Sequence, residues 1–306
     1  MKPIERVHII GMGALGMLFG SLITQKLGRE SVRFIMDDAR YDRCRHQQHR
    51  VNGVLTEFPA QRACEASPCD LVIVAVKSTG LETALDTMAT SVGPDTTIIS
   101  VLNGISSEEI IATRYGADRI VHTVAIAMDA MHFGNDLTYT NPGRLCLGVV
   151  NESVRPHLDR LTAFFDRTAV DYTVEENILR RMWSKFMVNV GINQTTMVYD
   201  IGYGGALQEG SQANVTLIGA MREVILLANA RGIDLNEQDL AEYLAILSTF
   251  PDDATPSMGQ DRRNRRPSEV EMFAGTVIRL AREHGIPVPA NQFLYRRVHE
   301  IESQYI

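Results

Sequence analysis

The sequence predicts an α/β fold in its first part, residues 1–175, and an all-α second part, residues 176–306. Three observations support this prediction. In the first part, apolar runs of strand length alternate with helical segments, and a glycine-rich turn joins the first strand to the first helix. After Glu175 the strand-like periodicity stops. Strands that alternate with helices are typical of a parallel sheet covered by helices, whereas a purely helical pattern indicates a separate layer.

The first strand, residues 6–10, leads into a glycine-rich turn that opens a helix at residues 14–27. The turn has the spacing G-x-G-x-x-G and consists of Gly11, Met12, Gly13, Ala14, Leu15 and Gly16. In such turns the first glycine permits a tight bend, the second lets a pyrophosphate approach the backbone, and the third lets helix and strand pack closely. The positive end of the helix attracts the phosphate charge. This context predicts an N-terminal Rossmann dinucleotide-binding domain, residues 1–175.

Residues 7–23 also have the length and apolarity of a signal-peptide core. Their four glycines and the order strand, turn and helix favour the nucleotide-binding turn.

The second strand, residues 32–36, ends in Asp37. An acidic residue about 20 positions past the glycines usually accepts hydrogen bonds from the ribose hydroxyls of the cofactor, and it repels a ribose 2′-phosphate. Arg40, Arg43 and Arg45 follow, and a nearby arginine is the usual partner of that phosphate. Most of these residues are expected in a solvated loop, so the choice between NAD and NADP stays open.

Two further buried strands end in polar residues. Residues 69–77 form a continuous apolar run that ends at Lys77, and residues 96–102 are followed by Asn103. Open α/β sheets bind ligands at the carboxyl ends of their strands, so both side chains are cofactor candidates. A lysine that only extends into solvent explains Lys77 equally well, and Asn103 could instead cap the next helix.

Residues 120–128, 137–140 and 144–150 are shorter candidate strands, which we expect to form the outer, partly antiparallel part of the same sheet. A helix at 154–168 and a last strand at 170–174 complete the first part.

The second part contains four helical segments at residues 182–198, 212–231, 237–249 and 269–284. The first is apolar on nearly every face, except that Lys185, Asn189 and Asn193 recur at a spacing of four. This spacing places them in one polar stripe about 80° wide. A buried polar stripe requires polar partners, which are either another part of the protein or a ligand. Residues 249–267 show little regular pattern, and their arginines, Arg262, Arg263, Arg265 and Arg266, are expected in a solvated loop, although one of them could contact an anionic substrate or the cofactor.

Composition excludes several classes of function. The net charge of −7 argues against non-specific binding to nucleic acid or to anionic membranes. The four cysteines form no C-x-x-C pair and have no histidine at metal-ligand spacing, which predicts a reduced cytoplasmic protein without a metal.

With these motifs the sequence resembles the 2-dehydropantoate 2-reductase (ketopantoate reductase) family over essentially its whole length. The matching pieces are GMGALG at 11–16, VAVK at 74–77, LNG at 102–104, Asn-Pro-Gly-Arg at 141–144, K-x-x-x-N-x-x-x-N at 185–193, PSMGQD at 256–261 and RRPSEVE at 265–271. The resemblance implies a Rossmann domain followed by a helical substrate-binding and catalytic domain, residues 176–306, with substrate held between them.

The resemblance also implies roles for individual residues. Lys185 corresponds to the general acid, and Asn189 and Asn193 to residues that orient the substrate. Ser257 and Glu269 correspond to substrate contacts, with Glu269 beside both the reaction and the cofactor. Asn103 and Lys77 match positions near the nicotinamide and the substrate. Hydride addition to a ketone builds negative charge on oxygen, which an ammonium group stabilises and protonates.

One departure concerns the cofactor. Many family members have an arginine at the end of the second strand, where this chain has Asp37. We therefore expect NADP(H) from the resemblance and NAD(H) from Asp37 as a serious alternative.

Three functions remain open at this point. The first is reduction of 2-dehydropantoate to (R)-pantoate, which belongs to pantothenate biosynthesis. The second is NADH-dependent reduction of another 2-keto acid to a D-2-hydroxy acid, and the third is a dinucleotide-sensing regulator without turnover. The resemblance allows a homodimer.

Overall fold

The computed structural model describes residues 2–305, and the chain divides into two compact units. The first unit contains residues 1–103 and 107–178, and the second contains residues 104–106 and 179–306. The predicted boundary at residues 175–176 lies within a few residues of the main division.

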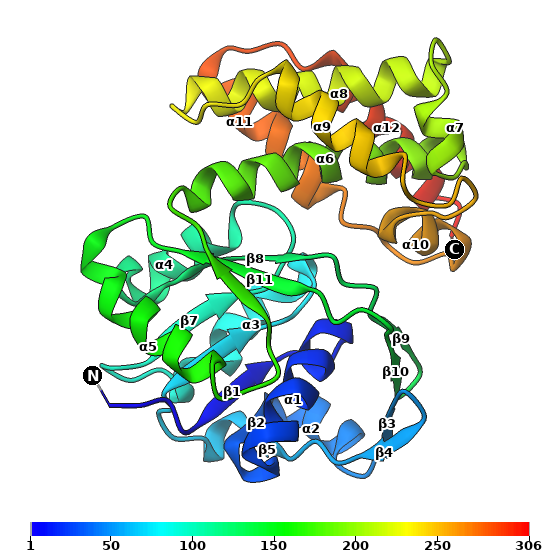
Figure 1. Cartoon of the computed structure of the whole chain (residues 1–306). Helices are drawn as coiled ribbons and strands as arrows, with labels where there is room; N and C mark the ends of the chain where they lie inside the picture. Colours follow the sequence, from blue (N-terminus) through cyan, green and yellow to red (C-terminus); the bar gives the residue numbers. More distant parts are fainter. Residues whose placement is uncertain (1, 306) are drawn as a thin grey trace. The chain divides into compact units, whose positions relative to one another are not determined.

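The first unit is built on a five-stranded parallel sheet with the strand order β5-β2-β1-β6-β7 (Figure 1). The strands are β1 (Val7–Ile10), β2 (Val32–Met36), β5 (Ala60–Arg62), β6 (Leu71–Val74) and β7 (Thr97–Ser100). The helices that follow them in the chain include α1 (Ala14–Leu27), α2 (Asp38–Cys44), α3 (Leu81–Thr87), α4 (Ser107–Tyr115) and α5 (Arg155–Phe165). Strand order reverses at β1, which is the arrangement that places a ligand at the carboxyl ends of β1 and β6.

Burial explains why the central strands are mostly apolar, with His8, Thr97 and Ser100 as their buried polar residues. All four residues of β1, β6 and β7 are buried, because helices cover both faces of the sheet. The predicted positions of these strands and of the helix 14–27 are confirmed.

The prediction that the later strands extend this sheet is wrong. β8 (His122–Ile126), β11 (Arg144–Gly148) and β12 (Tyr172–Val174) form a separate three-stranded sheet. A single parallel bridge, Ile98 to Ile120, joins β7 to the start of this segment. β8 pairs along all five of its residues with β11, whereas the backbone pairing of this segment with β7 is limited to that one bridge in the described residues.

A second small sheet has the order β4-β3-β10-β9, and only its strand β10 was predicted. Its strands are β3 (His49–Val51), β4 (Val54–Thr56), β9 (Met131–Phe133) and β10 (Asp136–Thr138). Asn52 and Gly53 join β3 to β4, and both have positive φ, 48° and 81°. An Asn-Gly pair between two strands is the strongest short-range signal of a hairpin.

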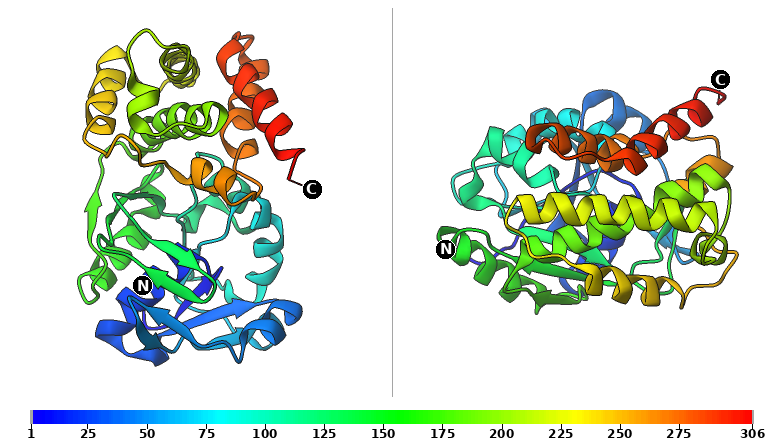
Figure 2. Two further views of the ribbon diagram at one scale, coloured as in Figure 1. Left: turned by 90° about the vertical axis from the view of Figure 1, so that its right-hand side faces the viewer. Right: turned by 90° about the horizontal axis from the view of Figure 1, so that it is seen from above.

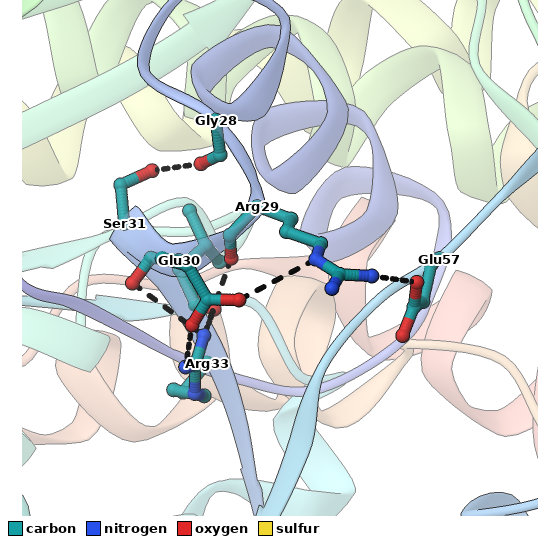
Figure 3. Close-up of polar contacts among 7 residues, drawn as sticks. Gly28, Arg29, Glu30, Ser31, Arg33 and Glu57 are labelled. Atoms are coloured by element: carbon teal, nitrogen blue, oxygen red, sulfur yellow. Dashed lines mark hydrogen bonds and ion pairs between the residues drawn. The ribbon is translucent and has the colours of Figure 1, made fainter.

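The connection from α1 to β2 is a short polar turn (Figure 3). Gly28, with φ 80°, ends the helix, and the Ser31 hydroxyl donates to its carbonyl at 2.7 Å. Arg29 pairs with Glu57, and Arg33 pairs with Glu30. These side chains are largely exposed, so each pair contributes only about 0–1 kcal/mol to stability. The turn leads directly into β2, the strand that Asp37 follows.

The second unit is helical throughout its described residues (Figures 1 and 2). Its elements are α6 (Ile178–Tyr199), α7 (Tyr203–Leu207), α8 (Gln212–Ala230), α9 (Glu237–Leu247), α10 (Ser257–Arg263), a π-helical turn (Glu271–Gly275), α11 (Thr276–His284) and α12 (Pro289–Glu302). α8 contacts α7, α9, α11 and α12 and is the core helix of the unit. Among the described residues it is also the one helix long and apolar enough to cross a membrane. However, 61% of its apolar stretch is buried inside the protein.

Three features of this unit differ from the predictions. Residues 257–263, expected to be irregular, form α10, and residues 289–302 form α12, which was not predicted. The segment 269–284 is not one regular α-helix, because its start contains the π turn.

Candidate functional site

The glycine-rich turn has the geometry that a pyrophosphate site requires. Gly11 has φ 109°, and a Cβ there would lie 2.5 Å from the Ala75 carbonyl oxygen, directly after β6. A Cβ at Gly16 would lie 1.9 Å from the Gly11 carbonyl oxygen, so only glycine lets α1 start this close to the turn. A Cβ at Gly13 would meet nothing within 4 Å.

Gly13 therefore borders open space at the start of a 14-residue helix. It is the N-cap of α1, and no side chain in the described part of the protein caps the helix N-terminus. The first N–H groups of α1 are available to an anion, which the helix dipole attracts. Met12, Ala14 and Leu15 complete the turn, with Met12 buried and the other two half-buried. These residues fit the pyrophosphate of a dinucleotide.

Asp37 follows β2, where it was predicted to contact the cofactor ribose. It also has a structural function that was not predicted. It is the N-cap of α2, and its Oδ1 accepts a hydrogen bond from the Arg40 N–H at 2.8 Å. The expectation of a loop at residues 38–45 is wrong, because this cap starts a helix there. Asp38 and Asp42 of α2 pair with Arg62 of β5, and Asp42 also pairs with Arg45, so these two carboxylates are neutralised by neighbouring arginines.

Lys77 and Asn103 lie beyond the carboxyl ends of β6 and β7, as predicted. Lys77 is exposed and precedes a short 3-10 turn, and Asn103 is half-buried. Both belong to the first unit, which also contains the glycine turn and Asp37.

The other predicted residues lie in the second unit. Lys185, Asn189 and Asn193 lie on α6 at the spacing of four that forms one stripe. Lys185 and Asn189 are half-buried, and Asn193 is 4% exposed. Their neighbours Phe186 and Ile192 are buried, so the stripe is the polar part of an otherwise apolar helix.

Ser257 is brought to this stripe by α10. Its hydroxyl donates to Asn193 Oδ1 at 3.0 Å, and the Met258 N–H lies 3.4 Å from the same oxygen. Asn193 Nδ2 lies 3.4 Å from Asn189 Oδ1. Asn193 thus holds Ser257 and Asn189 in one chain of hydrogen bonds.

Glu269 is half-buried and lies two residues before the start of the π turn at Glu271. Its carbonyl accepts from the Met272 and Phe273 N–H groups at 3.0 and 3.1 Å. Sequence analysis did not identify Gln194, whose side chain contacts this turn. Its position next to Asn193 on a buried helix face was the one available signal.

The arginine run is mostly solvent-facing, as expected, with one exception. Arg262 donates to the Met197 and Val198 carbonyls and pairs with Asp200 at 3.5 Å. These contacts satisfy carbonyls at the C-terminal end of α6, which a cation also stabilises through the helix dipole. Arg263, Arg265 and Arg266 are exposed. Among the described residues, no group of three or more His, Cys, Asp or Glu could hold a metal ion.

Comparison with known families agrees with this arrangement. A model of the ketopantoate reductase PanE/ApbA family matches residues 7–152, and a model of the PanE/ApbA C-terminal domain matches residues 177–302. The chain belongs to the ketopantoate reductase family. Family membership makes it an NAD(P)H-dependent oxidoreductase that resembles 2-dehydropantoate 2-reductase and uses a nicotinamide dinucleotide.

Curated ketopantoate reductases match over nearly their whole length. The 2-dehydropantoate 2-reductase of Streptococcus pyogenes serotype M1 is 24% identical over 304 residues, which cover 97% of this chain and 98% of the relative. The enzyme of Escherichia coli O157:H7 is 25% identical, with coverage of 98% and 96%.

Solved structures share the fold. The 2-dehydropantoate 2-reductase of Geobacter metallireducens GS-15 has a TM-score of 0.85 and 25% identity, covering 96% of this chain and 99% of that one. A complex of D-mandelate dehydrogenase with NADH has a TM-score of 0.87 at 22% identity, covering 98% and 100%.

Proposed function

We propose that this ketopantoate reductase family member reduces the ketone of 2-dehydropantoate to pantoate, with Lys185 as the general acid. A bound dihydronicotinamide supplies the hydride, which forms the new C–H bond at C2 of the keto acid. The electron pair of the C=O π bond moves to oxygen, and an Nζ–H proton of Lys185 passes to that oxygen. The single observation that supports this proposal best is the half-buried polar stripe on α6, with Ser257 hydrogen-bonded to it.

The other residues of the stripe have distinct parts in this proposal. Asn189 donates through Nδ2 to the carboxylate or hydroxyl of the substrate, because an amide holds an anion without adding charge. Asn193 aligns Asn189 and Ser257 through its hydrogen bonds. Glu269 is the carboxylate that contacts the substrate and orients the ammonium group of Lys185, and it also faces the cofactor. In the first unit, Asn103 and Lys77 serve the nicotinamide side, and residues 11–16 serve the pyrophosphate.

Substitution of Lys185 tests the proposal. Lys185→Ala should lower kcat by about 10²–10⁴-fold, because the developing alkoxide loses both its stabilising charge and its proton. Lys26→Ala is the matched control, since Lys26 is an exposed lysine at the end of α1. Near-wild-type kcat for Lys185→Ala would remove Lys185 from the acid role.

A second candidate is an NADH-dependent reductase of another 2-keto acid. The observation that favours it is Asp37 at the end of β2, because a carboxylate at this position repels a ribose 2′-phosphate. The NADH-bound D-mandelate dehydrogenase shares the fold. The two candidates use the same stripe and differ in the cofactor and in the side chain of the substrate. Homodimer formation, a cytoplasmic location and a place in pantothenate biosynthesis stay predictions.

A further inference from the structure

The π turn before α11 has an unusual hydrogen-bond partner. The Phe273 N–H donates to the carbonyl four residues back, that of Glu269, whereas the Gly275 N–H donates five residues back, to Val270. Between them, the Ala274 N–H donates to the side-chain Oε1 of Gln194 on α6 at 3.2 Å. A side chain thus contacts the backbone at the point where the helical ladder changes from a spacing of four to a spacing of five. The turn precedes α11 directly and contains one residue more than an α-helical turn, and π turns are frequent at functional sites.

The amide of Gln194 is held in one orientation. Its Nε2 donates to the Val190 carbonyl at 2.7 Å and lies 3.5 Å from Asn291 Oδ1. The side chain is completely buried. Because two acceptors face the nitrogen, the oxygen of the amide must face Ala274.

Asn291, which lies next to the Gln194 nitrogen, is also held in place. Asn291 is completely buried, and its Nδ2 donates to Glu223 Oε2 at 2.7 Å and to the Ala220 carbonyl at 3.2 Å. Glu223 also accepts from the N–H groups of Ala290 and Asn291 at the start of α12. A buried polar network therefore runs from α8 through α12 and α6 to the π turn, and all of it lies within the second unit.

The register of the π turn decides where Glu269 points. A turn that bonds five residues back contains one more residue than an α-helical turn. Glu269 and Val270, which accept its first hydrogen bonds, are therefore rotated by about 100° and shifted by about 1.5 Å from where a regular α-helix leading into α11 would place them. α11 itself is fixed, because its residues Val277, Leu280 and Ala281 are buried. Glu269 precedes the turn, so the direction of its side chain depends on the extra residue. Gln194 directly follows Asn193 on α6, so the helix that carries the polar stripe also contacts the π turn.

We infer that Gln194 is a positioning residue that holds the π turn and thereby aims Glu269 at the reacting substrate. This inference rests on the proposed function, because it gives Glu269 a part in the reaction. Loss of the Gln194 oxygen lets the turn relax toward regular α-helix, which rotates Glu269 away.

A double-mutant cycle tests the inference. Gln194→Met keeps the length of the side chain and removes the acceptor, and it should lower kcat/KM by about 10–100-fold, as expected when a catalytic contact is misplaced by an ångström. In the presence of Glu269→Gln, the same change should lower kcat/KM by less than about threefold, since the group that it positions is already disabled. Asn214→Leu is the matched control. Asn214 is a buried amide of the same unit that donates to the Ala206 carbonyl at 3.2 Å, away from the π turn.

We expect Asn214→Leu to lower the melting temperature about as much as Gln194→Met while keeping kcat/KM near the wild-type value. The inference would be overturned if Gln194→Met had a wild-type kcat/KM. It would also be overturned if the losses of kcat/KM in the Gln194→Met and Glu269→Gln single variants multiplied in the double variant. If Gln194→Met does not fold, Gln194→Leu removes the same acceptor with a side chain of similar volume, and wild-type kcat/KM in that folded variant would overturn the inference. Full activity of Glu269→Gln alone would instead refute the part of the proposed function that assigns Glu269 to the reaction.

Discussion

At the scale of single residues, Asp37 has one observed role in the fold and one predicted role in cofactor binding. Its Oδ1 caps α2 through the Arg40 N–H, and we propose that its second carboxylate oxygen accepts from the ribose hydroxyls. The sequence predicted the position of Asp37 at the end of β2. It did not predict the cap, because the run of charges after Asp37 resembled a loop.

Substitution of Asp37 by serine separates the two functions. Serine is also a good N-cap, so Asp37→Ser should keep the stability of the protein, while Asp37→Ala should lose about 0.5–2 kcal/mol. Both variants remove the charge that repels a 2′-phosphate. We expect the ratio of kcat/KM for NADPH to that for NADH to rise about tenfold, which corresponds to ~1.4 kcal/mol. An unchanged ratio in the folded serine variant would show that Asp37 does not contact the ribose.

At the scale of elements, the glycine turn was predictable because its causes are local. Its three glycines lie within six residues. Gly11 makes the bend, Gly13 leaves open space for a ligand, and Gly16 lets the helix pack closely against the turn. Strands β1, β2, β6 and β7 were predictable for the same reason, since burial on both faces requires continuous apolar runs.

Two alanine substitutions distinguish the structural glycine from the cofactor-binding one. Gly13→Ala places a methyl group in open space, so the free energy of unfolding should change by less than about 0.5 kcal/mol, while the cofactor KM rises at least about tenfold. Gly16→Ala forces a methyl group onto the Gly11 carbonyl and should cost about 3 kcal/mol or more. Thermal melts and cofactor titrations measure both effects. A wild-type cofactor KM in Gly13→Ala would contradict a pyrophosphate at this turn.

Other elements depend on contacts that are distant in the sequence. The π turn forms where Gln194 offers an acceptor 80 residues away, and nothing in residues 271–275 themselves indicates it. β8 pairs with β11 in a separate sheet, and only one bridge joins this segment to β7, which the apolar pattern of residues 120–128 does not indicate. The hairpin at Asn52 and Gly53 is different, because its signal was local and was overlooked.

At the scale of the whole molecule, the two units divide the proposed chemistry. The first contains the glycine turn, Asp37, Lys77 and Asn103, and the second contains the stripe, Ser257 and Glu269. The residue types and their spacing were readable from the sequence. The hydrogen bonds that hold Asn189, Asn193 and Ser257 together were not, because α10 reaches the stripe from 64 residues away.

The central claim is that this chain turns over a 2-keto acid with a nicotinamide cofactor. The most direct measurement is initial-rate oxidation of NADH and of NADPH with a panel of 2-keto acids that contains 2-dehydropantoate, other branched acids and aromatic acids. We expect turnover with at least one 2-keto acid and the highest kcat/KM with 2-dehydropantoate, and we expect Lys185→Ala to abolish most of it. A higher kcat/KM with NADH and another acid would favour the second candidate. No turnover with any acid and either cofactor, in a folded protein that still binds the cofactor, would contradict the account and favour a dinucleotide-sensing regulator.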